Sequence, residues 1–277
     1  MSGSTRKPKI LVARSIFPDI LERLEAFADI ESNQADHIWE SEALRRALMD
    51  KDAAIITGSE SIGEAHLKSA PHLKIISNIA VGYNNLDLSA LKAAHVMASN
   101  TPDVLTDTTA DFGFALLMAT ARRVTETEHW LRAGQWKKFS IFDTPLAMDI
   151  HHSTLGIIGM GRIGQAIAKR AAGFNMRVIY HNRSRLSPDL ENACGAHYVE
   201  RDVLLKEADH IILVMPYTPD NHHLFGEKEL QLMKPTATLI NIARGGIVDE
   251  LALVKALKEK RIFAAGIDVF EGEPTVR

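Results

Sequence analysis

The sequence contains almost no cysteine and no long hydrophobic run. Cys194 is the only cysteine among 277 residues, so the chain cannot form an internal disulfide. The longest apolar stretches, such as residues 211–215, have the length of a strand and are too short for a membrane helix. Residues 1–7 are polar and lack the apolar middle of a signal peptide. We therefore expect a soluble, cytoplasmic protein that does not insert into a membrane.

The chain also lacks a strong excess of charge. Its formal net charge is −3, with acids and bases scattered. A nucleic-acid partner is not indicated, because such surfaces need clustered Lys and Arg. There are 12 histidines, but none has a ligand-like spacing with a carboxylate, so we expect no metal site. Because 46% of the residues are hydrophobic, the chain can build two domains with their own cores.

Short apolar runs alternate with helical patterns along the whole chain. This alternation predicts an α/β fold with two doubly wound parallel-sheet domains, residues 1–100 and 101–277. In the first domain we expect strands at residues 9–13, 53–57, 73–77 and 96–99, and helices at residues 20–27, 42–49, 64–69 and 88–94. In the second we expect strands at residues 154–158, 177–180, 196–199, 210–214, 237–241 and 263–268.

The region that joins the two domains predicts one long helix. Thr101 can cap it, with Pro102 and Asp103 in its first turn. Residues 102–121 are apolar nearly all round, so this helix should be buried between the domains or against a partner subunit. A further helix is expected at residues 122–135, followed by a loop. Its aromatic groups and proline could form a subunit interface or pack within one chain; they are Trp136, Phe139, Phe142 and Pro145.

A glycine motif lies at the start of the second domain's alternation. The apolar run 155–158 leads into Gly159, Gly161 and Gly164, and a helical pattern follows at once. Such glycines let the backbone approach a pyrophosphate, and the free N–H groups of a helix N-terminus attract its charge. With Arg162 and Ile163, the motif predicts a dinucleotide site, since a second strand follows the helix.

The end of that second strand indicates which dinucleotide is bound. An NAD site usually carries an acid here to hold the ribose 2′-hydroxyl. This chain has Asn182, Arg183, Ser184 and Arg185 instead. Two guanidinium groups would attract a 2′-phosphate, so the sequence favours NADP(H), with NAD(H) possible. The alternative is an exposed basic turn without a ligand.

Four motifs in order resemble the D-isomer-specific 2-hydroxyacid dehydrogenase family. They are residues 80–87, the glycine motif, residues 241–246 and residues 268–274. Within the family, the chain is most similar to the NADPH-dependent glyoxylate/hydroxypyruvate and 2-ketogluconate reductases. The resemblance implies a flavodoxin-like substrate domain followed by a Rossmann domain, and a homodimer.

The resemblance assigns substrate contacts to three residues. Arg244 follows an expected strand, at the edge where ligands bind such sheets, and a guanidinium suits a carboxylate and a carbonyl oxygen that gains charge. Val81 and Gly82 would offer backbone N–H groups to the same carboxylate.

Further roles follow from the same resemblance. Asp268 would accept from the nicotinamide carboxamide. Glu273 would pair with a catalytic histidine, raising its pKa so that it can protonate the nascent alkoxide. Thr106, Pro216 and Ile242 match positions that line the cofactor.

The chain departs from the family pattern in one respect, because it lacks the family's catalytic histidine. It belongs to a Pro-His motif downstream of Glu273, and this chain ends at Arg277. Family members also continue with another strand and a closing helix. We expect that the natural chain extends beyond Arg277; a truly shortened protein is the alternative.

The leading hypothesis is therefore an oxidoreductase that reduces a small 2-keto acid to the D-2-hydroxy acid by hydride transfer from NADPH. Candidate substrates are glyoxylate, hydroxypyruvate and 2-ketogluconate. Two alternatives remain open. One is a non-catalytic NAD(P) sensor or partner-binding protein of the same fold, and the other is an NAD-linked D-2-hydroxyacid dehydrogenase.

Overall fold

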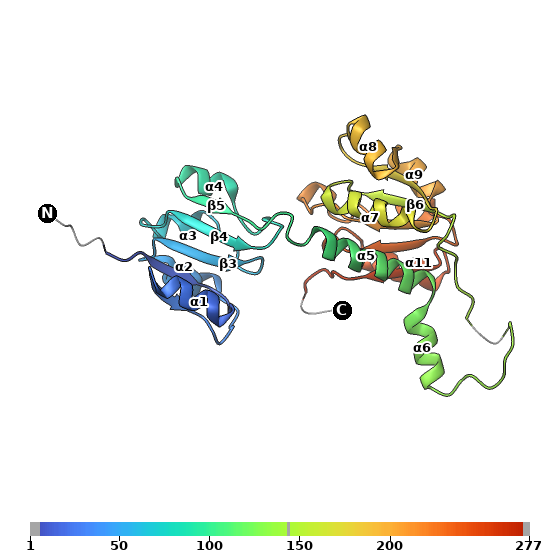
Figure 1. Cartoon of the computed structure of the whole chain (residues 1–277), viewed down its shortest axis with the longest axis horizontal. Coiled ribbons are helices and arrows are strands. Elements are labelled where there is room, and N and C mark those ends of the chain that lie inside the picture. The colour runs from blue at the N-terminus through green and yellow to red at the C-terminus, as the bar shows by residue number, and fades with distance from the viewer. Residues whose placement is uncertain (1–5, 143–144, 274–277) are drawn as a thin grey trace. The chain divides into compact units, whose positions relative to one another are not determined.

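Two separate parallel sheets organise the chain. The computed structural model describes residues 6–142 and 145–273. The chain divides into unit 1, Met1–Val104, and unit 2, Leu105–Arg277, and each unit is built on its own sheet (Figure 1). No helix within the described ranges is long and apolar enough to cross a membrane.

Unit 1 has a flavodoxin-like topology. Its strands run parallel in the order β2-β1-β3-β4-β5, which is the doubly wound order of flavodoxin-like folds. The strands are β1 (Lys9–Val12), β2 (Asp29–Ser32), β3 (Ala53–Thr57), β4 (Ile75–Ile79) and β5 (Met97–Ser99). The helices are α1 (Pro18–Glu25), α2 (Ser41–Leu48), α3 (Glu64–Ser69) and α4 (Leu88–Ala93).

Unit 2 has the Rossmann topology. Its strands run parallel in the order β11-β10-β9-β6-β7-β8, so the order reverses between β6 and β9. The strands are β6 (Thr154–Ile158), β7 (Arg177–His181), β8 (Ala196–Tyr198), β9 (His210–Leu213), β10 (Thr238–Asn241) and β11 (Ala264–Ile267). The helices are α5 (Thr106–Ala121), α6 (Val124–Arg132), α7 (Arg162–Ala172), α8 (Pro188–Cys194), α9 (Arg201–Glu207), a 3-10 turn (Pro219–Asn221), α10 (Glu227–Leu232) and α11 (Glu250–Lys258).

Both faces of the unit 2 sheet are buried, which explains its continuous apolar strands. Successive side chains of a strand point to opposite faces. Ile212 therefore packs in the cluster with residues of α5 and α7, whereas Ile211 and Leu213 pack in the cluster with residues of α9, α10 and α11. The predicted α/β fold with two doubly wound parallel sheets is confirmed.

Two local expectations were wrong. Helix α5 begins at Thr106, not in the Thr101–Asp103 turn, because Asp103 has a left-handed φ of 71° and the Thr101 N–H donates to the Ala80 carbonyl. Strand β2 was missed because its residues are polar and only half-buried. It forms an edge of the sheet, where a strand needs no continuous apolar run.

One face of helix α5 is buried within its own unit. Its face formed by Ala110, Gly113, Phe114 and Leu117 packs against α7 and the strands β9–β11. Another side of the helix is exposed at Asp107, Asp111 and Phe112, so its expected burial between the domains or against a partner subunit stays a prediction.

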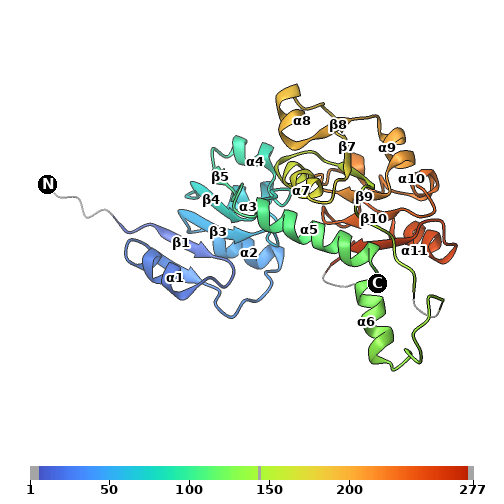
Figure 2. The ribbon, with the colours of Figure 1, turned by 45° about the vertical axis from the view of Figure 1, so that its right-hand side comes forward.

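Helix α6 and the segment after it project away from the unit 2 sheet in both views (Figures 1 and 2). The segment has no regular secondary structure in residues 137–142 and 145–149. Its aromatic side chains are largely exposed in the described part of the chain, with Trp136 54%, Phe139 92% and Phe142 89% exposed.

The Asp249 side chain stabilises the start of α11. It accepts hydrogen bonds from the N–H groups of Leu251 and Ala252, at 3.0 and 3.1 Å. We expect Asp249→Ala to lower the free energy of unfolding by about 0.5–2 kcal/mol, because two N–H groups lose their acceptor. Urea unfolding measures this change. Asp249→Ser keeps an acceptor and should lose much less; equal losses in the two variants would contradict the capping role.

Candidate active site

The glycine turn after β6 brings three backbone segments into close contact. Gly159 has φ +103°, and a Cβ there would lie 2.7 Å from the Met215 nitrogen. A Cβ on Gly164 would lie 2.4 Å from the Gly159 oxygen. By contrast, a Cβ on Gly161 would meet nothing within 4 Å. Two glycines therefore allow the turn to close, and the third leaves open space at the N-terminus of α7, the kind of place where helices attract anions.

Asn182 fixes the orientation of this turn. Its Oδ1 accepts a hydrogen bond from the Met160 N–H at 2.6 Å, and the Gly159 N–H donates to the His181 oxygen at 3.1 Å. The end of β7 thus holds the peptide between the first two glycines. Arg162 and Ile163 form the first turn of α7, with Arg162 exposed and Ile163 half-buried.

The two arginines of the basic turn differ in their surroundings. Arg183 and Ser184 are exposed, and their side chains make no hydrogen bond or ion pair with a described residue. Arg185 instead donates through Nε and Nη2 to the two carboxylate oxygens of Glu191, at 2.9 and 2.8 Å. Arg183 is therefore the guanidinium available to an anion, whereas Arg185 already has a carboxylate partner.

Glu191 sits at the centre of a buried network. The Tyr180 hydroxyl donates to its Oε1 at 2.7 Å and accepts from the Leu186 N–H at 2.9 Å. The hydrogen bonds from Arg185, then from Tyr180, lower the pKa of Glu191 to about 2. Burial and the neighbouring Glu191 raise the pKa of Tyr180 to about 12. Both side chains are therefore held in one charge state near neutral pH.

Arg244 projects from a turn that Asn241 holds. Asn241 is 1% exposed, and it accepts from the Ala243 N–H at 3.0 Å and donates to the Arg244 oxygen at 3.2 Å. The Arg244 side chain is exposed and donates to the Ala243 oxygen at 2.7 Å. Because this turn follows β10, its guanidinium lies at the carboxyl edge of the sheet, like the glycine turn after β6.

The turn after β11 lies against the Arg244 turn. A Cβ on Gly245 would lie 2.0 Å from the Phe270 oxygen, so only glycine permits this approach. The Glu271 N–H donates to Glu250 Oε1 at 2.7 Å, which also ties the turn after β11 to the start of α11. Unit 2 therefore brings Arg244 and residues 268–273 together at one edge of the sheet.

Asp268 and Glu273 lie in this second turn. Asp268 is exposed, and its side chain has no hydrogen bond with a described residue. Glu273 accepts a hydrogen bond from the Phe270 N–H at 3.1 Å, and no described histidine is its partner. Pro274, which ends the motif, lies outside the described residues.

The remaining proposed cofactor residues also belong to unit 2. Thr106 is the first residue of α5, Pro216 follows β9 and is exposed, and Ile242 follows β10 and is 7% exposed. Pro216 and Ile242 lie at the carboxyl ends of neighbouring parallel strands, on the edge that carries the glycine turn.

In unit 1, the loop after β4 presents two free amides. The Ala80 oxygen accepts from the Thr101 N–H at 3.0 Å and the Val81 oxygen accepts from Asn100 at 2.9 Å, which fixes the peptide planes that carry the Val81 and Gly82 N–H groups. Asn78 also donates to the Gly82 oxygen at 3.0 Å. Neither of the two N–H groups has an acceptor among the described residues. Two oriented, unpaired N–H groups after a strand can bind a small anion.

Two buried asparagines connect this loop to the end of β3. Asn78 is 2% exposed and donates to Asn85, 9% exposed, at 3.3 Å. Asn85 in turn donates to the oxygens of Thr57 and Glu60 at 3.0 and 2.9 Å. Removal of Asn85 would take this donor from the Thr57 and Glu60 oxygens, and removal of Asn78 would take it from the Gly82 oxygen.

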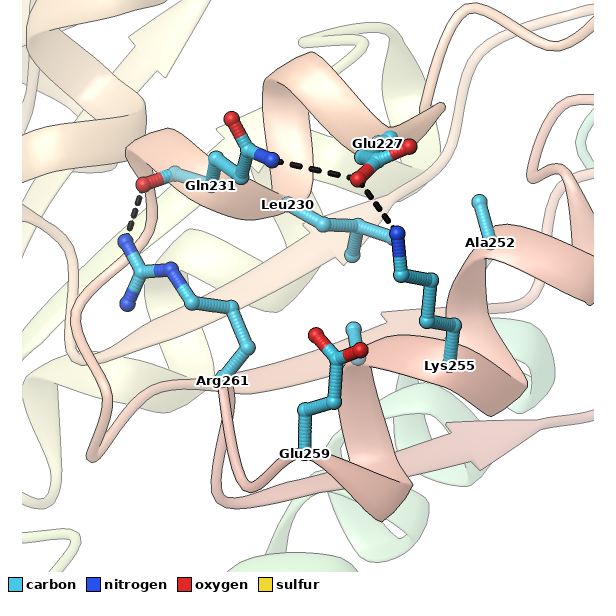
Figure 3. Close-up of a pocket in the computed structure, with 8 residues that line it drawn as sticks. Glu227, Leu230, Gln231, Ala252, Lys255, Glu259 and Arg261 are labelled. Carbon is cyan, nitrogen blue, oxygen red and sulfur yellow. Dashed lines mark hydrogen bonds and ion pairs between the residues drawn. The ribbon is translucent and has the colours of Figure 1, made fainter.

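A separate cleft lies between α10 and α11, as Figure 3 shows. Three of its charged groups have partners: Glu227 pairs with Lys255 at 2.7 Å, and Arg261 donates to the Gln231 backbone oxygen. Arg261 lies in the connection that enters β11, at the amino end of the strand, whereas the glycine turn and Arg244 lie at carboxyl ends. This cleft is therefore not a candidate for the cofactor or the substrate.

Sequence reasoning missed the residues that orient the site. They are Asn78, Asn85, Glu191, Asn241 and Glu250. A polar residue inside or at the end of an apolar strand was the available signal for Asn78 and Asn241, because buried amides need partners. Glu191 and Glu250 lie in helices, and only the folded chain reveals their partners.

The fold and the glycine turn together define a dinucleotide-binding α/β protein. Residues 114–277 match the family model described as the NAD binding domain of D-isomer specific 2-hydroxyacid dehydrogenases. This match and the relatives below show that the chain belongs to the D-isomer specific 2-hydroxyacid dehydrogenase family. It is an oxidoreductase with a nicotinamide-dinucleotide-binding unit.

Several similar proteins are described as glyoxylate reductases. One from Thermococcus onnurineus is 46% identical over 271 residues, which cover 97% of this chain and 81% of that protein. A crystal structure of a glyoxylate reductase from Paecilomyes thermophila has a TM-score of 0.88 at 31% identity, covering 99% of this chain and 84% of that chain. A Sinorhizobium meliloti NADPH-dependent glyoxylate/hydroxypyruvate reductase, in complex with NADP and malonate, has a TM-score of 0.84 at 33% identity, covering 98% and 82%.

The Glu191 network should make stability depend on acid pH. Because the folded-state pKa is about 2 and the ordinary value is 4.5, the contribution of ionised Glu191 is complete above pH 4.5. It is lost as the pH falls toward 2. We expect Glu191→Gln to be less stable than the native protein near neutral pH and to lose less stability on acidification.

Urea unfolding at about pH 6 and about pH 3 measures both effects. Glu22→Gln is the matched control, because Glu22 is exposed in α1 and its side chain makes no hydrogen bond or ion pair with a described residue. It should follow the native pH dependence. An equal pH dependence of Glu191→Gln and the native protein would contradict the role of the Arg185–Glu191 pair.

Proposed function

We propose that the protein reduces a small 2-keto acid to the D-2-hydroxy acid with NADPH, and that glyoxylate is its leading substrate. The observation that carries this proposal is the placement of the exposed Arg244 guanidinium on the same sheet edge as the glycine turn. Hydroxypyruvate and 2-ketogluconate are further candidate substrates. Family membership and the glyoxylate reductases similar to this chain support the proposal.

The proposal gives each unit one task. Unit 2, with the segment from residue 101, would bind the cofactor, and residues 1–100 would form the substrate-binding domain. The reduced nicotinamide, when bound, supplies the hydride. The chain's own part is to bind the pyrophosphate with Gly159, Gly161, Arg162, Ile163 and Gly164. Asp268 would accept from the carboxamide, while Thr106, Pro216 and Ile242 would line the cofactor.

Arg244 would hold the substrate and help its reduction. A guanidinium binds a carboxylate through paired donors, and it stabilises a carbonyl oxygen that gains negative charge. The Val81 and Gly82 amides would bind the same carboxylate. Glu273 would orient a histidine that protonates the product oxygen, as the family pattern implies. Its present partner, the Phe270 N–H, leaves its other oxygen available.

NADP(H) preference would rest mainly on Arg183 and Ser184. Both side chains are exposed and unpaired among the described residues, so they can donate to a 2′-phosphate. Arg185 would add positive charge, but its Nε and Nη2 are committed to Glu191. Asn182 would act indirectly by holding the Met160 peptide. NAD(H) remains an alternative cofactor.

The protein would act as a homodimer. Large apolar side chains on α6 and the segment after it are exposed, and contiguous exposed apolar groups mark interaction sites. They are Val124, Leu131, Trp136, Phe139, Ile141, Phe142 and Leu146. A second copy of the chain could cover them.

A second candidate function is nucleotide sensing without turnover. The observation that favours it is the glycine turn itself, which can bind a dinucleotide without any catalytic group. An NAD-linked dehydrogenase is the third candidate. Both differ from the proposal in measurable behaviour.

Turnover with purified protein, expressed from its complete coding region, separates these candidates. We expect NADPH absorbance at 340 nm to fall when glyoxylate is added, with a lower KM for NADPH than for NADH. Tight NADPH binding without oxidation by any of the three keto acids would support the sensor. A lower KM for NADH would overturn the assignment of NADPH.

The two arginines of the basic turn should contribute unequally to NADPH binding. We expect Arg183→Ala to weaken NADPH binding about 10- to 100-fold, since a charge-assisted hydrogen bond contributes roughly 1.5–3 kcal/mol. Arg185→Ala should weaken NADPH binding less. Neither change should weaken NADH binding comparably, because NADH lacks the phosphate. Fluorescence titration measures the affinity of each variant for NADPH and for NADH. An equal loss of affinity for both nucleotides would contradict the phosphate contact.

Arg244 should matter for turnover more than for the cofactor. We expect Arg244→Ala to lower kcat/KM for glyoxylate by at least about 10²–10³, the cost of removing one such donor. Arg244→Lys should keep only part of the native kcat/KM, because an ammonium group lacks the planar, paired donors of a guanidinium. NADPH affinity should stay near the native value. Unchanged keto-acid reduction in Arg244→Ala would refute the role.

A further inference from the structure

Two histidines and a glutamate converge beside the Arg244 turn. His222 and His223 follow the 3-10 turn 219–221, and Glu271 lies in the turn after β11. His223 Nε2 is 3.1 Å from Glu271 Oε2, and His222 Nε2 is 3.9 Å from Glu271 Oε1. The two imidazole rings stack with centroids 3.9 Å apart. Forty-eight residues separate His223 from Glu271, so only the folded chain creates this cluster.

Backbone contacts hold the three side chains in place. The His223 N–H donates to the Gly246 oxygen at 2.7 Å, and the Glu271 N–H donates to Glu250 Oε1 at 2.7 Å. The Tyr217 hydroxyl lies 3.3 Å from His222 Nδ1, which leaves Nε2 of that ring directed to Glu271. Such a contact to the second ring nitrogen is how proteins orient metal-binding histidines.

The donor set suits a divalent transition ion. Imidazole nitrogen and carboxylate oxygen bind Zn²⁺, Ni²⁺ and Cu²⁺. The three ligand atoms lie within 4.8 Å of one another, so a central point is at most about 2.8 Å from each. Zn–N and Zn–O distances are about 2.0–2.2 Å. The side chains are 42%, 38% and 34% exposed, so small rotations can bring the ligand atoms to these distances and separate the stacked rings.

We propose that His222, His223 and Glu271 form a binding site for one divalent transition ion such as Zn²⁺, with water completing its coordination. This departs from the expectation of no metal site, which rested on residue spacing alone. Because the histidines must lose the proton on the coordinating nitrogen, binding weakens at acidic pH.

An ion here would tie together two segments next to the proposed catalytic residues. Glu271 lies two residues before Glu273. The His223 N–H donates a hydrogen bond to the oxygen of Gly246, which lies two residues after Arg244. Bound Zn²⁺ should therefore raise the melting temperature and slow keto-acid reduction. The effect on reduction rests on the proposed function, whereas binding itself does not.

The test is calorimetric titration of the full chain, purified without a polyhistidine tag, with ZnCl₂ at about pH 7.5. We expect one ion per chain. His223→Ala and Glu271→Ala should each weaken binding at least tenfold. His72→Ala, an exposed histidine of unit 1, is the matched control and should bind as the native protein does. Circular dichroism verifies that each variant is folded.

Co²⁺ gives a readout independent of both Zn²⁺ heat and activity. Its visible absorption should show a nitrogen- and oxygen-ligated ion in the native protein and in His72→Ala, but not in the double variant His222→Ala/His223→Ala. Zn²⁺ affinity that is unchanged in folded His223→Ala and Glu271→Ala would overturn the proposal, as would an absence of binding to the native protein. Zn²⁺ binding to a protein without reductase activity would sustain the site and refute only the proposed function.

Discussion

The close approach of backbone at the Gly159 turn is the constraint on which unit 2 depends. Gly159 lies against the backbone at Met215, just after β9, and Gly164 lies against the Gly159 oxygen. Strands β6 and β9 and helix α7 therefore come together where there is no room for a side chain. The strand order reverses at this same place, between β6 and β9. Open space beside Gly161 then lies at the N-terminus of a helix, which attracts a phosphate.

A close backbone approach at a glycine also shapes the carboxyl end of β10. Gly245 lets the Phe270 backbone lie against the Arg244 turn, and Asn241 fixes both sides of that turn. Because the backbone that carries Arg244 is fixed, binding an anion there needs no ordering of the backbone, and only the side chain loses freedom. The preorganisation therefore comes from buried amides and glycines, not from the arginine itself.

Arg183 and Arg185, near the proposed 2′-phosphate site, are close in sequence but have different surroundings. Glu191 neutralises Arg185 and leaves Arg183 as the available guanidinium. Tyr180, buried beside them, connects this pair to the sheet. The sequence placed both arginines near the proposed phosphate, whereas the structure shows that one of them, Arg185, already has a carboxylate partner.

The sequence by itself determined the alternation of strands and helices, the glycine turn and the position of Arg244, because each depends on local periodicity or on one residue type. It could not reveal strand β2, which is polar, or the late start of α5, which a left-handed Asp103 delays. Only the tertiary structure decided which charges are paired. Arg185 meets Glu191, Gly245 meets Phe270, and His222 and His223 meet Glu271 only when the chain folds. No local sequence pattern predicts these contacts.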